Sequence, residues 1–243
     1  MKASFDFAGH VVLVAGAASG IGRATVTASL EAGATVLAMD VDAVGLATLP
    51  ASPRLQTGNI DISDSSAVRS AIDAWVAAHG RIDAAVITSA LQKRAPIEQL
   101  SDTDWQRHLD VNLSGVFYVV RSLFPVMKRQ RSGAIVTFTS GLATNGWPGA
   151  AAYAATKAGL IGLVKCAALE LRGYGVRINA LSPGLVSTPV FLDSASSEEL
   201  AMYERTLGVS TPQEVVPTIL YLISDAGATI SGNVVERRLI PRP

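Results

Sequence analysis

Residues Val11–Gly22, VVLVAGAASGIG, decide how this chain folds. The apolar run His10–Ala15 predicts a buried strand, and the pattern Gly20–Ala32, which Gly33 ends, predicts a helix. Between them, the glycines of Gly16–Gly22 let the backbone turn sharply and let a pyrophosphate approach the helix N-terminus. A plain tight turn has the same composition, but the position between a strand and a helix favours a dinucleotide site.

Short runs rich in valine and isoleucine alternate with longer helical patterns along the rest of the chain. Further strands are predicted at Ala34–Met39, Arg54–Thr57, Ala84–Thr88, Ala134–Thr139 and Val176–Leu181, and further helices at Asp61–His79, Ser101–Arg131 and Ala150–Arg172. This alternation predicts an α/β fold with a doubly wound parallel sheet and helices on both faces. We find no internal repeat or domain boundary, so residues 1–243 are expected to form a single domain.

Composition excludes several classes of protein. The 243 residues are 49% hydrophobic and carry 20 basic and 20 acidic side chains, which does not fit a nucleic-acid-binding protein. The densest basic run, Lys128–Arg131, is typical of a solvated helix end. The only cysteine, Cys166, has apolar neighbours and is predicted to be a buried thiol. Without a secretory signal or an apolar run of membrane-spanning length, we expect a cytoplasmic protein with no membrane partner; no metal is expected.

An acidic residue ends the second predicted strand. Asp40 lies 18 residues beyond Gly22, where a carboxylate can accept hydrogen bonds from the adenosine ribose and would repel a 2′-phosphate. NAD is therefore preferred over NADP, although Asp40 could instead cap the next helix. Asp61 and Ile62, after the third strand, could reach the adenine, and Asp61 could equally be a helix cap.

A tyrosine and a lysine stand four residues apart in the small-residue run GAAAYAATKAGL, Gly149–Leu160. Tyr153 and Lys157 therefore lie on one helix face, and the ammonium is expected to lower the pKa of the phenol towards working pH, which would make Tyr153 a usable acid/base. Ser140 follows a predicted strand at the end where parallel sheets bind ligands. Asn112 lies inside a predicted helix, where a structural role, a bond to its own helix or a neighbour, is the more common one.

These residues together resemble the classical short-chain dehydrogenases/reductases over nearly the whole chain. The matching positions are Gly16–Gly22, Asn112, Ser140, Tyr153, Lys157 and the Pro183-Gly184 segment. The resemblance implies a single Rossmann-type domain, assembled as a homotetramer or homodimer.

The resemblance also implies roles for individual residues. Tyr153 would be the acid/base, Lys157 would lower its pKa and bind the nicotinamide ribose, and Ser140 would orient the substrate oxygen. Asn112 would hold a water of a proton relay. Contacts to the cofactor are expected from Gly16, Ser19, Gly20, Ile21, Gly22, Asp40, Asp61, Ile62, Ile87, Ala90, Tyr153, Lys157, Pro183, Gly184, Val186 and Thr188.

The chain departs from the family pattern in two places that matter for function. Ile87-Thr88-Ser89-Ala90 replaces Asn-Asn-Ala-Gly, so Ile87 can bond only through its backbone and Ala90 adds a methyl group near the cofactor ribose. The C-terminal segment 231–241 has two arginines and lacks the usual Asp-Gly-Gly, which could change the assembly.

A short substrate lid is expected near residues 188–206. Its aromatic residues could line a pocket or pack on the body of the protein, and Lys93 and Arg94 near the mouth could serve a carboxylate. We expect an NAD(H)-dependent oxidoreductase that interconverts a small or medium secondary alcohol and its ketone by hydride transfer. The alternatives are an NADPH-dependent 3-oxoacyl-carrier-protein reductase-like enzyme and a non-catalytic NAD-binding regulatory protein.

Overall fold

The computed structural model describes residues 4–240, and these residues build one parallel seven-stranded sheet in the order β3-β2-β1-β4-β5-β6-β7. The strands are β1 (Val11–Ala15), β2 (Thr35–Asp40), β3 (Leu55–Asn59), β4 (Ala84–Ile87), β5 (Gly133–Phe138), β6 (Val176–Ser182) and β7 (Val234–Glu236). The strand order reverses between β1 and β4. Open parallel sheets bind ligands at the carboxyl ends of the strands beside such a reversal.

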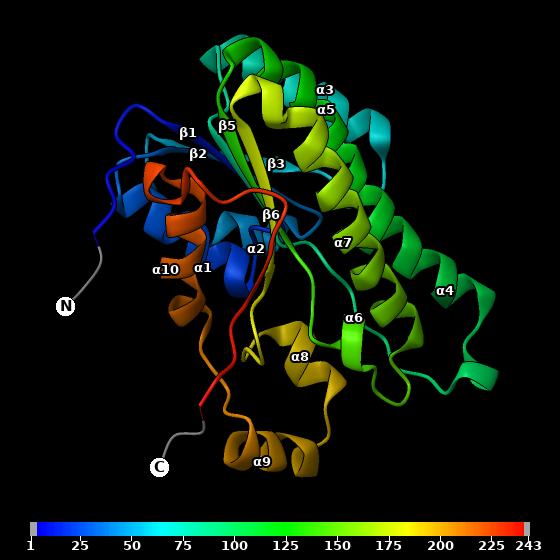
Figure 1. Ribbon diagram of the computed structural model, residues 1–243. Coiled ribbons are helices and arrows are strands. Elements are labelled where there is room, and N and C mark those ends of the chain that lie inside the picture. Colours follow the sequence, from blue (N-terminus) through cyan, green and yellow to red (C-terminus); the bar gives the residue numbers. More distant parts are fainter. Residues whose placement is uncertain (1–3, 241–243) are drawn as a thin grey trace.

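Helices cover both faces of the sheet (Figure 1). The longer ones are α1 (Gly20–Glu31) and α10 (Pro212–Ile223) on one face, and α3 (Ser65–His79), α5 (Val116–Gln130) and α7 (Ala151–Leu171) on the other. Shorter elements are α2 (Ala43–Ala47), α4 (Asp102–His108), α6 (Leu142–Asn145), α8 (Pro189–Ser194), α9 (Ser197–Thr206) and the single turns Ile97–Gln99, Arg172–Tyr174 and Asp225–Gly227. The predicted doubly wound α/β fold is therefore confirmed.

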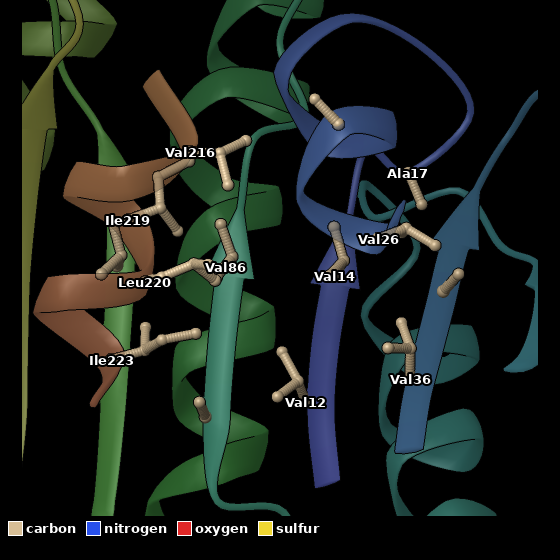
Figure 2. Packing of buried hydrophobic residues seen from close by; sticks show 14 of the residues in the cluster. Val12, Val14, Ala17, Val26, Val36, Val86, Val216, Ile219, Leu220 and Ile223 are labelled. Atoms are coloured by element: carbon tan, nitrogen blue, oxygen red, sulfur yellow. The ribbon is translucent and has the colours of Figure 1, made fainter. Parts of the chain in front are cut away.

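Two hydrophobic clusters, one on each face, hold the layers together. Val12 and Val14 of β1 point to the cluster shared with α1 and α10, where Figure 2 shows Val14 beside Val26 of α1. Leu13, between them, points to the cluster shared with α3, α5 and α7. Because both faces are buried, the central strands β1 and β4 are apolar at every position, which is the signal that identified them in the sequence.

The predicted helix over Ser101–Arg131 is not a regular α-helix. It consists of α4, a π-helical segment over Leu109–Gly115, and α5. By length and composition alone, the helical stretches 102–130 and 151–174 are long and apolar enough to cross a membrane. No apolar segment of that length was expected from the sequence. Both stretches contribute buried side chains to the cluster that packs on the sheet.

The prediction that Cys166 is buried is wrong. Cys166 is exposed on α7, although its neighbours Val164, Ala167 and Ala168 are buried. Each residue turns a helix by about 100°, so a residue beside buried positions can still face outward. Cys166 lies on that outer side with Leu169, which is 73% exposed.

Candidate active site

A cavity of about 620 Å³ opens at the carboxyl ends of the strands. The predicted site residues that line it are Gly16, Ser19, Gly20, Ile21, Gly22, Asp40, Asp61, Ile62, Ala90, Ser140, Tyr153, Lys157, Pro183, Gly184, Val186 and Thr188. Two predicted residues, Ile87 and Asn112, do not line it. The fold thus gathers residues from seven separate segments of the chain at one opening.

The glycine-rich turn is tightly packed against the first turn of α1. A Cβ atom on Gly22 would overlap the Gly16 carbonyl oxygen and would lie 2.6 Å from Thr88 Oγ1. Gly16 and Gly20 have φ angles of 82° and 50°, which glycine adopts without strain. Ser19 is the N-cap of α1 but makes no side-chain cap. The first-turn N–H groups therefore face the cavity without a side-chain acceptor, as a phosphate site requires.

The carboxylate of Asp40 lies against this turn. Its Oδ2 accepts a hydrogen bond from the Ala18 backbone N–H at 2.9 Å, and its Oδ1 accepts one from Asp42 N at 2.9 Å. The N-cap of α2 is Asp42 rather than Asp40, so the helix-cap interpretation of Asp40 is wrong. Both bonds fix the carboxylate at the edge of the cavity, where it remains able to accept from a ribose hydroxyl.

Asp61 and Ile62 also reach the cavity. The N-cap of α3 is Asp64, whose carboxylate accepts from the backbone N–H groups of Ser66 and Ala67, so Asp61 is not that helix cap. Asp61 instead accepts from Ser63 in a short local turn.

At the end of β4, Ile87 and Thr88 stand where the family pattern has two asparagines. Ile87 is 1% exposed and packs in the core, so only its backbone serves the sheet. Thr88 replaces the second Asn of the family motif, and its hydroxyl donates to the carbonyls of Ala15 at 2.9 Å and Gly16 at 3.0 Å. Thr88 therefore holds the glycine turn in place, a function that the sequence reasoning did not assign to it.

Tyr153 and Lys157 come from one face of α7, and the lysine is almost fully buried. Lys157 Nζ donates to the Phe138 carbonyl at 2.8 Å and lies 5.5 Å from the centre of the Tyr153 ring. Thr139 Oγ1 donates to the Lys157 carbonyl at 2.8 Å, which ties this turn of α7 to the end of β5. Helical spacing thus sets the pair side by side, as predicted.

The predicted direction of the Tyr153 pKa is wrong for this structure. Burial raises the pKa of Tyr153 to about 12, and the Ser140 hydroxyl acts in the opposite direction. Burial also lowers the pKa of Lys157 to about 8. The physical reason is that both groups lie in a protein-lined pocket, where loss of hydration disfavours the phenolate and the ammonium alike.

Asn112 lies in the π-helical segment and is completely buried. Its Oδ1 accepts from Leu91 N and its Nδ2 donates to the Leu91 carbonyl, each at 2.8 Å. A weaker contact of 3.4 Å reaches Thr156 on α7. Asn112 therefore positions Leu91, which lines the cavity, and connects it to α7.

The C-terminal segment supports the loop after β6. Gly184 has a φ angle of 76°, and a Cβ atom there would lie 3.0 Å from the Arg237 carbonyl oxygen. The Arg237 guanidinium donates to the Pro183 carbonyl at 2.8 Å and to the Glu214 carbonyl at 3.0 Å. One of the two unusual arginines thus connects the Pro183-Gly184 segment to α10.

The predicted lid region consists of α8 and α9, which lie beyond the carboxyl ends of the strands near α6 (Figure 1). Tyr203 of α9 is 5% exposed and lies between the rings of Trp147 and Phe191, with centroids 5.9 and 6.0 Å away. All three rings line the cavity. The aromatic residues therefore both pack together and form a cavity wall.

Comparisons with known proteins agree with this geometry. A family model described as "Enoyl-(Acyl carrier protein) reductase" matches residues 16–236. The chain is 36% identical over 234 residues to the 3-oxoacyl-[acyl-carrier-protein] reductase FabG of Thermotoga maritima, covering 93% of this chain and 95% of that protein. It is 36% identical over 242 residues to the D-threitol dehydrogenase of Mycolicibacterium smegmatis, covering 96% and 93%.

A solved structure shows the same architecture. The 3-ketoacyl-(acyl-carrier-protein) reductase from Brucella melitensis complexed with NADH has a TM-score of 0.88 and 25% identity, with coverage of 95% of this chain and 97% of that one. Sequence, site and fold therefore agree: this chain belongs to the short-chain dehydrogenase/reductase family of oxidoreductases.

Proposed function

We propose that this protein is an NAD(H)-dependent enzyme that interconverts a small or medium secondary alcohol and its ketone. The observation that carries the proposal is that one cavity brings Ser140, Tyr153 and Lys157 together with the glycine-rich turn and Asp40. The first group suits proton transfer at a substrate oxygen, and the second suits a dinucleotide. A non-catalytic binding protein would have no need of the first group.

Charge around the ribose end supports NAD over NADP. The Asp40 carboxylate is held in place by two backbone N–H groups. Arg23, which directly follows the glycine turn in the sequence, donates to the hydroxyl and carbonyl oxygens of Thr48, so it is already engaged. A 2′-phosphate would meet the fixed carboxylate and would have to recruit Arg23 from these partners.

The chain's own residues would manage the proton and the substrate oxygen, while the nicotinamide supplies or accepts the hydride. Because the pKa of Tyr153 is raised to about 12, its phenol is protonated at neutral pH and can donate a proton to a ketone oxygen. Lys157, whose pKa is about 8, is mostly an ammonium at neutral pH. Its charge near the Tyr153 ring stabilises the phenolate that forms when the proton leaves. Ser140 borders the same space and can hydrogen-bond the substrate oxygen.

The relatives support a second candidate. Similarity to FabG favours a 3-oxoacyl-carrier-protein reductase, and similarity to the D-threitol dehydrogenase favours a small polyol-like substrate. Asp40 supports an NAD-linked reaction, because its carboxylate would repel the 2′-phosphate of NADPH. We further propose that the enzyme is a homo-oligomer, as the family resemblance implies, and that it works in the cytoplasm, as expected from the sequence.

Turnover by a matched pair of tyrosine variants tests the reaction. Purified protein is assayed with NADH or NADPH and a panel of ketones, and with NAD and the matching alcohols. We expect NADH-dependent turnover that Tyr153→Phe abolishes and Tyr221→Phe, an exposed tyrosine of α10, leaves unchanged. Full activity of Tyr153→Phe, or turnover with NADPH alone, would contradict the proposal.

A further inference from the structure

An ion pair lies on the lid side of the cavity, away from the glycine turn. Arg94 Nη1 donates to both carboxylate oxygens of Glu199, at 2.9 and 3.0 Å. The side chains of Arg94 and Glu199 are only 19% and 26% exposed. Arg94 lines the cavity, and Glu199 comes from α9, so the pair joins the loop after β4 to the lid.

Glu199 is held by more than the arginine. Its Oε2 accepts from the Ser196 backbone N–H at 2.9 Å, in the capping box of α9, and its Oε1 accepts from Trp147 Nε1 at 3.2 Å. The hydrogen bond from Ser196, followed by the hydrogen bond and charge of Arg94, lowers the pKa of Glu199. A substrate carboxylate would therefore have to compete for Arg94 with the ionised Glu199 carboxylate, which accepts four hydrogen bonds.

The other cations at the cavity are poorly placed to replace Arg94. Lys157 donates to the Phe138 carbonyl at the catalytic end. Arg107 is exposed on α4, where solvent and salt screen its charge. The walls around the ion pair are the rings of Trp147 and Tyr203. Arg94, whose side chain is 19% exposed, is thus bordered by aromatic rings and neutralised by Glu199.

We propose that Glu199 sets the charge class of the substrate: by neutralising Arg94 it makes the cavity accept compact uncharged alcohols and ketones and reject those bearing a carboxylate. The inference rests on the proposed alcohol–ketone chemistry and narrows its substrate class. It also corrects the idea that Lys93 and Arg94 are free to serve a carboxylate, because Lys93 pairs with Asp104 at 2.8 Å.

Glu199→Gln tests the proposal, because glutamine keeps the capping box but removes the charge. Two probes are compared, cyclohexanone carrying either a methyl group or a carboxylate at the para position. Their binding to the protein–NADH complex is measured by calorimetry, and their reduction is measured by NADH oxidation. Wild type should favour the neutral probe. The variant should shift the acid-to-neutral ratio of affinities by about tenfold towards the acid, which is about 1.4 kcal/mol.

Two further variants separate charge from structural damage. Arg94→Gln in the Glu199→Gln background should restore the preference for the neutral probe, because the cation that would attract the acid is then removed. Asp104→Asn is the matched control: it frees Lys93, whose side chain is 64% exposed, and should leave the ratio unchanged.

Several results would overturn the inference. They are a wild-type preference for the acid, an unchanged ratio in Glu199→Gln, an equal shift in Asp104→Asn, or no binding of either probe. The ratio is read from binding as well as turnover. A shifted binding ratio without reduction of either probe would therefore contradict the proposed reaction while leaving the charge assignment intact.

Discussion

Substitution of Gly22 by alanine should damage both the fold and the cofactor site. The new Cβ atom would overlap the Gly16 carbonyl oxygen and would lie 2.6 Å from Thr88 Oγ1 and 2.7 Å from the Gly16 carbonyl carbon. Two of these three atoms are backbone, so the turn cannot yield by a side-chain rotation. The start of α1 must then move away from the turn, at a cost of about 1–3 kcal/mol in the free energy of unfolding. Cofactor affinity should fall at least about tenfold, because the N–H groups that face the phosphates move with the helix.

Gly162→Ala provides a matched control for this substitution. Gly162 lies within α7, and nothing lies within 4 Å of the position that its Cβ would take. Alanine there should leave NADH affinity unchanged and should stabilise the protein by about 0.5–1 kcal/mol. Urea unfolding and NADH fluorescence titration measure the two effects. Wild-type stability and affinity in Gly22→Ala would refute the reasoning that close packing at Gly22 builds the phosphate site.

Three more predictions concern buried polar contacts. Burial lowers the pKa of Lys157 from 10.5 to about 8, so the unfolded chain binds more protons than the folded protein between these pH values. The free energy of unfolding should therefore rise from pH 8 to 10.5 in wild type relative to Lys157→Met. Parallel stability curves for the two proteins would contradict this prediction. Arg237→Gln should destabilise the protein by about 1–3 kcal/mol in urea unfolding. Arg238→Gln, which changes an 89% exposed side chain, should change the free energy of unfolding by less than about 0.5 kcal/mol. Equal destabilisation by the two substitutions would contradict the structural role of Arg237. Thr88→Val should cost about 1 kcal/mol and weaken NADH binding, because the glycine turn loses a hydrogen bond at Gly16; unchanged affinity would show that Thr88 does not hold the turn.

The fold was predictable because its signals are local. Strands such as Val11–Ala15 are buried on both faces and therefore apolar throughout, and the turn that follows requires glycine at fixed places. The spacing of Tyr153 and Lys157 was enough to place them on one helix face. Family resemblance then supplied roles for residues, such as Ser140, whose local sequence carries little information.

The remaining features depend on packing between distant segments. Arg94 and Glu199 are 105 residues apart, so nothing in either local sequence indicates their ion pair. The raised pKa of Tyr153 reflects the depth of the pocket, which spacing along α7 does not determine. The exposure of Cys166 depends on how α7 is rotated against the sheet, so the burial predicted from its apolar neighbours was wrong.

The central claim is that the cavity binds NAD through Asp40 and the glycine-rich turn. Its most direct test is a fluorescence titration of the purified protein with NADH and with NADPH, repeated for Asp40→Ala. We predict that wild type binds NADH at least about tenfold more tightly than NADPH. Asp40→Ala should weaken NADH binding and reduce the ratio of NADH affinity to NADPH affinity. Equal or tighter binding of NADPH by the wild-type protein, or no binding of either nucleotide, would contradict the account.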